Sequence, residues 1–154
     1  MLDRGEPCPA FQLPDQTGAL RSLRELMGRK GLVLYAYPKD NTPGCTLEAL
    51  EFTAELPAFR RKGYNVVGLS KDSVVAHQKF ITCHSLGIPL LSDPEASLLQ
   101  ALGAWGPKTM RGRTSLGILR STFVFGAEGR LLKAYPRVKA EGHAAQVLAD
   151  LATL

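Results

Sequence analysis

The sequence has little cysteine and no long apolar run, and both absences exclude broad classes of protein. Three cysteines in 154 residues are too few, and odd in number, for the disulfide framework of a small secreted protein. No apolar stretch approaches the ~18 residues of a membrane-spanning helix. The N-terminal residues lack the apolar core of a secretory signal, so we expect a cytoplasmic protein. In that reducing compartment a cysteine is structural, metal-binding or reactive.

Charge and composition exclude further classes of protein. The chain has 19 Lys and Arg against 14 Asp and Glu, which gives a formal net charge of +5. The basic residues are scattered and their densest groups, at 60–62 and 108–113, are short, so we predict no nucleic-acid partner. A hydrophobic share of 45% argues against disorder. No repeat or charged linker divides the chain, which predicts one domain over residues 1–154.

Hydrophobic patterns predict alternating strands and helices. Short apolar runs indicate buried strands at 31–37 and 65–70, a hairpin at 121–125 and 131–135, and a weaker strand at 88–91. Helical patterns occupy 46–61, 73–84, 94–102 and 141–151. Asp72 is a plausible N-cap for the second helix, and Pro57 is expected to kink or end the first. This alternation predicts an α/β domain whose mixed central sheet is covered by helices.

The turn after the strand at 31–37 contains Cys45. Thr42 can act as the N-cap of the following helix, and Pro43 then takes the first helical position, where its missing N–H costs nothing. Cys45 falls in the first helical turn, beside unpaired backbone N–H groups and the positive end of the helix dipole. In open α/β sheets, sites form at the carboxyl ends of strands, where this turn lies.

A reactive cysteine in this turn needs positive charge in addition to that of the helix dipole. A free thiol is mostly protonated at neutral pH, and a helix N-terminus stabilises an anion by at most ~2 kcal/mol. A cation within ~4–6 Å favours the thiolate more strongly. We therefore expect the fold to bring an Arg or Lys to Cys45. The alternative, a small buried apolar residue, describes Cys8 better than Cys45.

The segment 37–49 resembles the active site of peroxiredoxins, and in particular the bacterioferritin comigratory protein, or peroxiredoxin Q, subfamily. The family signature is Pro, three residues, Thr, two residues, Cys, and it matches Pro38, Thr42 and Cys45. Further matches at 5–15, 90–93, 117–123 and 138–143 extend the resemblance along nearly the whole chain. It implies a thioredoxin-like fold with an N-terminal β-hairpin. It also implies antioxidant reduction of hydrogen peroxide and organic hydroperoxides, without a metal or organic cofactor.

The resemblance also implies roles for single residues. Cys45 would be the peroxidatic cysteine, which attacks the O–O bond as a thiolate. Arg120 would be the expected cation, stabilising the thiolate and the leaving oxygen. Thr42 would hydrogen-bond the peroxide, assisted by backbone N–H groups of Gly44 and Cys45, and Pro38 would shield the sulfur from water.

Glu48, one helical turn beyond Cys45, has two open interpretations. It is either a supporting hydrogen-bond partner or a solvated carboxylate on the helix face. A thioredoxin-type disulfide oxidoreductase would need a second sulfur three residues from Cys45, where Thr42 and Glu48 stand, so this function is disfavoured. A non-enzymatic redox sensor on the same fold remains an alternative.

The identity of the second sulfur is left open. Attack on peroxide yields a sulfenic acid that a thiol can capture as a disulfide. Many relatives carry that resolving cysteine at the position of Leu50; others carry it on the next helix, where Cys83 lies on one predicted face with Ala76 and Phe80. Cys83 is thus an intramolecular resolving cysteine, a packing residue of an enzyme that uses an external thiol, or an intermolecular partner. Cys8 is a weaker resolving candidate.

Partners and metals follow from the same resemblance. A thioredoxin-like dithiol would recycle the disulfide, and the subfamily is often monomeric. His77 and His84 are weak signals, because no Cys-x-x-Cys or His-x-x-x-His pair accompanies them, and we predict no metal site. His143 is expected at the start of the last helix.

Overall fold

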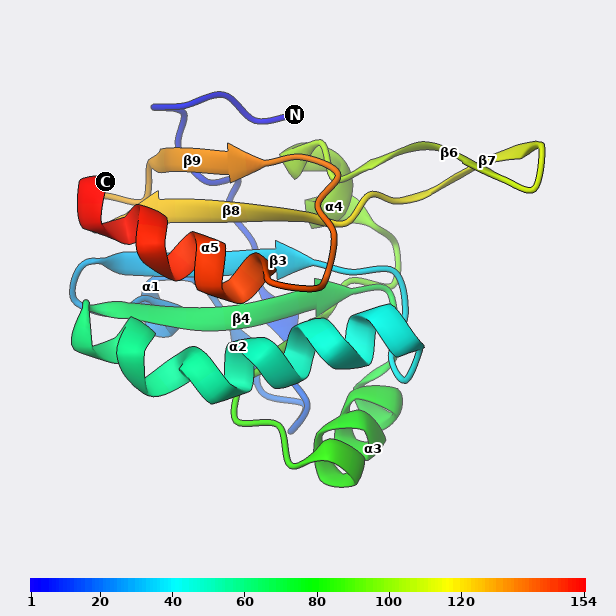
Figure 1. Ribbon diagram of the computed structural model, residues 1–154, viewed down its shortest axis with the longest axis horizontal. Helices are drawn as coiled ribbons and strands as arrows, with labels where there is room; N and C mark the ends of the chain where they lie inside the picture. The colour runs from blue at the N-terminus through cyan, green and yellow to red at the C-terminus, as the bar shows by residue number, and fades with distance from the viewer.

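A five-stranded mixed sheet forms the centre of the computed structural model, which describes residues Met1–Leu154 (Figure 1). The strand order is β5-β4-β3-β8-β9. The strands are β3 (Gly31–Ala36), β4 (Tyr64–Ser70), β5 (Leu90–Ser92), β8 (Ser121–Gly126) and β9 (Leu131–Tyr135). The first three are parallel, while β8 and β9 are antiparallel to their neighbours. The predicted strands and the hairpin of β8 and β9 are thus confirmed, with β5 beginning two residues later and ending one residue later than expected.

Helices cover both faces of this sheet. They are α1 (Leu23–Leu26), α2 (Pro43–Arg61), α3 (Val74–His84), α4 (Ser97–Leu102) and α5 (His143–Asp150), which continues into a short 3-10 turn, η1 (Leu151–Thr153). Figure 1 shows α2 and α5 together in front of the sheet, whereas α1 and α4 lie behind it. No helix is both long and apolar enough to cross a membrane.

The two faces of β3 build two separate cores. Val33 and Tyr35 pack with Phe52 and Phe59 of α2 and Val147 of α5. The intervening side chains pack with α4 and α1, and these are Leu32, Leu34 and Ala36. Because β3 is buried on both faces, its sequence is continuously apolar rather than alternating.

Helix α2 begins at Pro43, the position that follows the predicted cap Thr42, and thus three residues before the helical pattern at 46–61. It ends at Arg61 as that pattern predicts. Pro57 lies inside the helix, so the expectation that it could end the helix is wrong. Helix α3 is capped by Ser73, whose Oγ accepts from the N–H of Ala76 at 3.1 Å. Asp72 is therefore not the cap; its carboxylate accepts hydrogen bonds from Ser70 and the Asp40 backbone instead.

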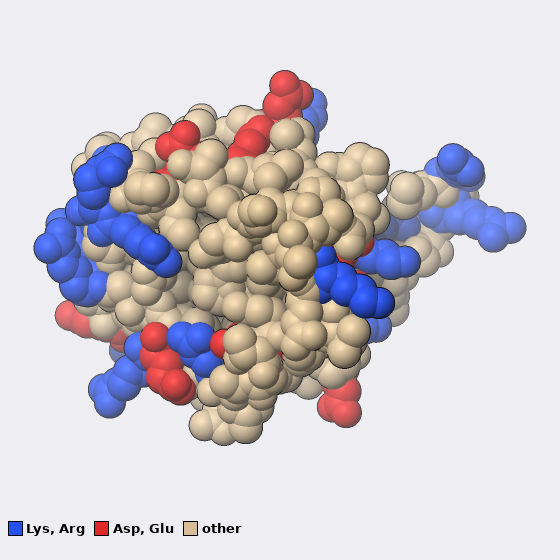
Figure 2. Space-filling view, turned by 90° about the horizontal axis from the view of Figure 1, so that it is seen from below, with Lys and Arg blue, Asp and Glu red and all other residues tan.

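Two hairpins lie outside the main sheet. The expected N-terminal hairpin is short, pairing β1 (Leu13–Pro14) with β2 (Leu20–Arg21). The second pairs β6 (Trp105–Met110) with β7 (Arg113–Ile118), and it was not predicted. It projects from the body as an arm in Figure 1, and Figure 2 shows Lys and Arg side chains along it. Its turn holds Arg111 and Gly112 at φ of 52° and 76°.

Candidate active site

Cys45 lies where the chain leaves the carboxyl end of β3 and enters α2. Thr42 is the N-cap residue, in an extended conformation, and Pro43 occupies the first turn. Both local predictions are confirmed. Cys45 follows within that first turn, and its side chain is buried, with 1% of the residue exposed. The thiol therefore sits beside the N-terminal backbone groups of a 19-residue helix.

Arg120 provides the cation that Cys45 was expected to need. Strand β8 pairs antiparallel with β3 so that Ser121 lies opposite Ala36, and this register brings the residue before β8 to the end of β3. Arg120 Nη2 donates to Cys45 Sγ at 3.2 Å. A charged donor at this distance stabilises a thiolate relative to a thiol.

The same guanidinium also binds Glu48. Arg120 Nη1 donates to Glu48 Oε1 at 2.6 Å, and Glu48 is buried, so the interpretation as a solvated helix-face carboxylate is wrong. Burial raises the pKa of Glu48 to about 7, although Arg120 opposes this shift. The second oxygen, Oε2, is buried without a hydrogen-bond partner. Burial alone would lower the pKa of Arg120, but Glu48 and Cys45 raise it above its ordinary value, so the guanidinium stays charged.

Thr42 and Gly44 flank Pro43 at the start of α2, just before Cys45. The Thr42 hydroxyl donates to the carbonyl of Lys39 at 2.8 Å. Although Thr42 is the N-cap residue, its side chain accepts no hydrogen bond from the helix, which leaves its oxygen able to accept. A Cβ on Gly44 would stand 3.3 Å from Arg120 Nη2. A side chain there would displace the guanidinium by a few tenths of an ångström.

A surface pocket of about 360 Å³ opens beside Arg120. Pro38 forms part of its wall, together with three apolar side chains and three polar or charged ones: Met110, Leu119 and Val138, and Lys108, Thr109 and Arg137. The unpredicted arm thus contributes to the wall. A small molecule in this pocket would meet Arg120, a cationic rim and an apolar surface.

The other two cysteines differ in exposure. Cys83 lies in the continuous helix α3, which puts it one turn beyond Phe80 as predicted, but its side chain is exposed whereas Phe80 is fully buried. All three cysteines are free thiols. Burial raises the pKa of Cys8 to about 12, which makes it a poor nucleophile. Leu50 is 41% exposed.

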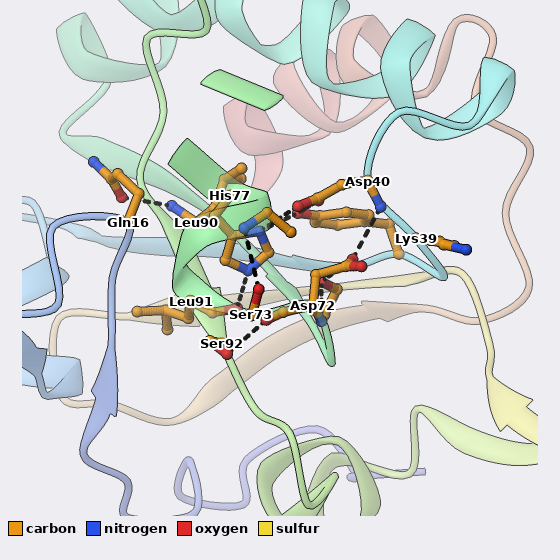
Figure 3. A network of polar contacts seen from close by, with 12 residues as sticks. Gln16, Lys39, Asp40, Asp72, Ser73, His77, Leu90, Leu91 and Ser92 are labelled. Carbon is orange, nitrogen blue, oxygen red and sulfur yellow. Dashed lines mark hydrogen bonds and ion pairs between the residues drawn. The ribbon is translucent and has the colours of Figure 1, made fainter. Parts of the chain in front are cut away.

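A buried polar network, shown in Figure 3, was not anticipated from the sequence. His77 Nδ1 lies 2.7 Å from Asp40 Oδ2, and the side chain of Asp72 accepts from the Asp40 N–H at 2.9 Å. These three side chains offer potential metal-ligand atoms within 4.8 Å of one another. The ligand atoms of Asp40 and His77 already hydrogen-bond to each other, so these atoms satisfy one another without a metal ion.

His143, as expected, begins α5, where its Nε2 lies 2.7 Å from Thr122 Oγ1.

Comparison with known proteins decides the family. The AhpC/TSA family matches residues 4–134. The chain belongs to this peroxiredoxin family. Peroxiredoxin Bcp of Xanthomonas campestris is 41% identical over 146 residues, covering 94% of this chain and 91% of that protein. Peroxiredoxin Bcp of Bacillus subtilis is 39% identical over 150 residues, or 97% and 95% of the two chains.

Solved peroxiredoxin structures have the same fold. Peroxiredoxin Q of Xanthomonas campestris matches with a TM-score of 0.86 and 42% identity, over 93% of this chain and 90% of that one. A cysteine-to-serine variant of the Xylella fastidiosa PrxQ matches with a TM-score of 0.92 and 36% identity, over 99% and 97%. The predicted thioredoxin-like fold is thus confirmed, and this peroxiredoxin is a thiol-dependent peroxidase.

Proposed function

We propose that Cys45 is the peroxidatic cysteine of this peroxidase, acting as one domain over residues 1–154. The observation that carries the assignment is the donor contact from Arg120 to its sulfur at 3.2 Å. The Cys45 thiolate attacks the terminal oxygen of a hydroperoxide. An S–O bond forms and the O–O bond breaks, which leaves a sulfenic acid on Cys45 and an alkoxide or hydroxide that takes up a proton.

The surrounding residues have distinct parts in this step. Arg120 stabilises the thiolate and then the charge that develops on the leaving oxygen. The Thr42 hydroxyl, which donates to Lys39, accepts from the peroxide O–H, and the N–H groups of Gly44 and Cys45 assist. Pro38 limits the access of water to the sulfur. Glu48 fixes the guanidinium from its other side through the contact at 2.6 Å.

The substrate class follows from the pocket beside Arg120. Met110, Leu119 and Val138 give it an apolar wall, which suits an alkyl group attached to the peroxide. A structural study of the Xanthomonas campestris relative is concerned with its alkyl peroxide reduction activity and ligand complexes. We therefore propose organic hydroperoxides as substrates alongside hydrogen peroxide.

Cys83 is proposed to resolve the sulfenic acid as an intramolecular disulfide. Its exposure makes it accessible both to this reaction and to a thioredoxin-like dithiol that reduces the product in a monomeric enzyme. A disulfide requires Cα atoms within about 7 Å. Cys45 is buried in α2 against Arg120 whereas Cys83 is exposed on α3, so we propose that the segments that carry them rearrange when the bond forms.

Three serine variants test these roles. With one equivalent of hydrogen peroxide, Cys83→Ser is expected to consume peroxide as fast as the unmodified enzyme, but to turn over poorly with thioredoxin. Cys45→Ser should consume none, and full activity of this variant would refute the assignment. Cys8→Ser is the matched control, because that half-buried thiol lies outside the proposed machinery, and it should behave as the unmodified enzyme.

A further inference from the structure

The buried pair of Asp40 and His77 holds a proton between its two side chains. His77 is fully buried, and both ring nitrogens face oxygen: Nδ1 lies 2.7 Å from Asp40 Oδ2, and Nε2 lies 3.0 Å from the Leu91 carbonyl (Figure 3). A carbonyl only accepts, so Nε2 carries a hydrogen. A lone pair on Nδ1 would then repel an ionised Asp40. One proton must therefore lie between Nδ1 and Oδ2, and it joins the two side chains through a hydrogen bond.

The neighbours of the pair leave it little freedom to adopt another geometry. Tyr37 Oη donates to the second Asp40 oxygen at 2.6 Å. The Asp40 N–H donates to Asp72, which also accepts from Ser70 Oγ at 2.7 Å. The end of β3, the turn after it, the loop before α3, and β5 thus all contribute a group. Removal of one partner from such a network leaves a buried polar group unpaired, which lowers the stability of the folded protein.

The pair also joins the two segments that carry the reactive thiols. Asp40 belongs to the turn that leads into Cys45, and His77 belongs to α3, which carries Cys83. A second, exposed contact reinforces the link near the end of α3, where His84 Nε2 lies 3.0 Å from Asn41 Oδ1. In this arrangement Cys45 is buried against Arg120 while Cys83 faces solvent.

We infer that Asp40 and His77 are positioning residues that favour the attack on peroxide and oppose disulfide formation. The pair holds the turn so that Cys45 meets Arg120, and it holds α3 so that Cys83 stays apart. Formation of the Cys45–Cys83 bond requires the contact to open. The second half of this inference rests on the proposed resolving role of Cys83, whereas the first half does not.

Two rate constants test the inference in Asp40→Asn and His77→Asn. In each variant, oxidation of Cys45 by hydrogen peroxide should slow roughly tenfold, which corresponds to ~1.4 kcal/mol of lost positioning. Disulfide formation after a single turnover should become faster. The double variant should lose no more than either single one, because the two side chains act through one contact. A purely structural role would change both rates in the same direction or change neither, and that result would overturn the inference.

Matched variants separate this effect from loss of stability. Asp15→Asn removes another buried carboxylate, paired with Arg21 at 2.9 Å in the N-terminal hairpin, and should leave both rates unchanged. If the buried-pair variants do not fold, His84→Ala tests the same link by removing the partner of Asn41; faster disulfide formation is expected, and an unchanged rate would refute the link. If the sulfenic acid persists in every protein, Cys83 does not resolve it, and the peroxide rate alone then supports or overturns the positioning role.

Discussion

At the scale of single residues, the site depends on one guanidinium that serves two acceptors. Arg120 donates through Nη2 to Cys45 and through Nη1 to Glu48, so its orientation is fixed from both sides. A planar fork of donors can satisfy both acceptors at once, whereas an ammonium on a flexible chain acts as a point charge. The identity of the cation therefore matters as much as its charge.

Arg120→Lys is expected to slow the reaction of Cys45 with hydrogen peroxide by about a hundredfold, the usual cost of losing one preorganised donor. Competition kinetics against a peroxidase of known rate would measure this. Retention of the full rate would mean that positive charge alone is sufficient.

Glu48 predicts a specific dependence of stability on pH. Its pKa in the folded protein is about 7, raised mainly by burial above an ordinary value of 4.5, so the folded state holds this proton more tightly than the unfolded state. The resulting stabilisation is complete below pH 4.5 and is lost as the pH rises through 7. The free energy of unfolding should thus fall from pH 5 to pH 8 by more in the unmodified enzyme than in Glu48→Gln. Urea denaturation of both proteins measures this, and parallel pH profiles would contradict it.

At the scale of elements, the first turn of α2 contains a glycine that lowers helix stability but lets Arg120 come close to Cys45. Gly44 is the second residue of this helix, where alanine is the better helix former, yet a Cβ would stand 3.3 Å from Arg120 Nη2. Glycine at this position therefore gives up helix propensity and leaves room for the guanidinium beside the thiol.

Gly44→Ala is expected to leave the melting temperature unchanged or slightly higher, while the rate of Cys45 oxidation falls several-fold. Thermal unfolding and stopped-flow oxidation by hydrogen peroxide would be measured on the same preparation. An undiminished rate in this variant would show that the close approach of Arg120 has no functional importance.

The elements also differ in how far the sequence predicts them. The buried strands β3, β4, β8 and β9 were predicted because continuous apolar runs between turn residues have few other interpretations. The β6–β7 arm was missed because its exposed strands carry charges and have no apolar alternation. Its one local signal was Gly112 in the two-residue turn. Asp72 was misread as a helix cap because the sequence alone cannot show that its carboxylate has partners in a distant turn.

At the scale of the whole molecule, the sheet brings together residues that are far apart in the sequence. Arg120 contacts Cys45 across 75 positions because β8 runs antiparallel beside β3. The need for a cation followed from thiol chemistry, but its identity came from a family resemblance. The Asp40–His77 contact spans 37 positions and had no sequence signal, since a histidine in a helix without a ligand motif beside it is compatible with many environments.

Intact mass and peptide mapping of the reduced protein after one equivalent of hydrogen peroxide would show what becomes of both sulfur atoms. We expect the loss of two hydrogens and a linked peptide that contains Cys45 and Cys83. Oxygen retained on Cys45, with no linked peptide, would contradict resolution by Cys83. An unchanged mass would contradict the peroxidatic role of Cys45 itself.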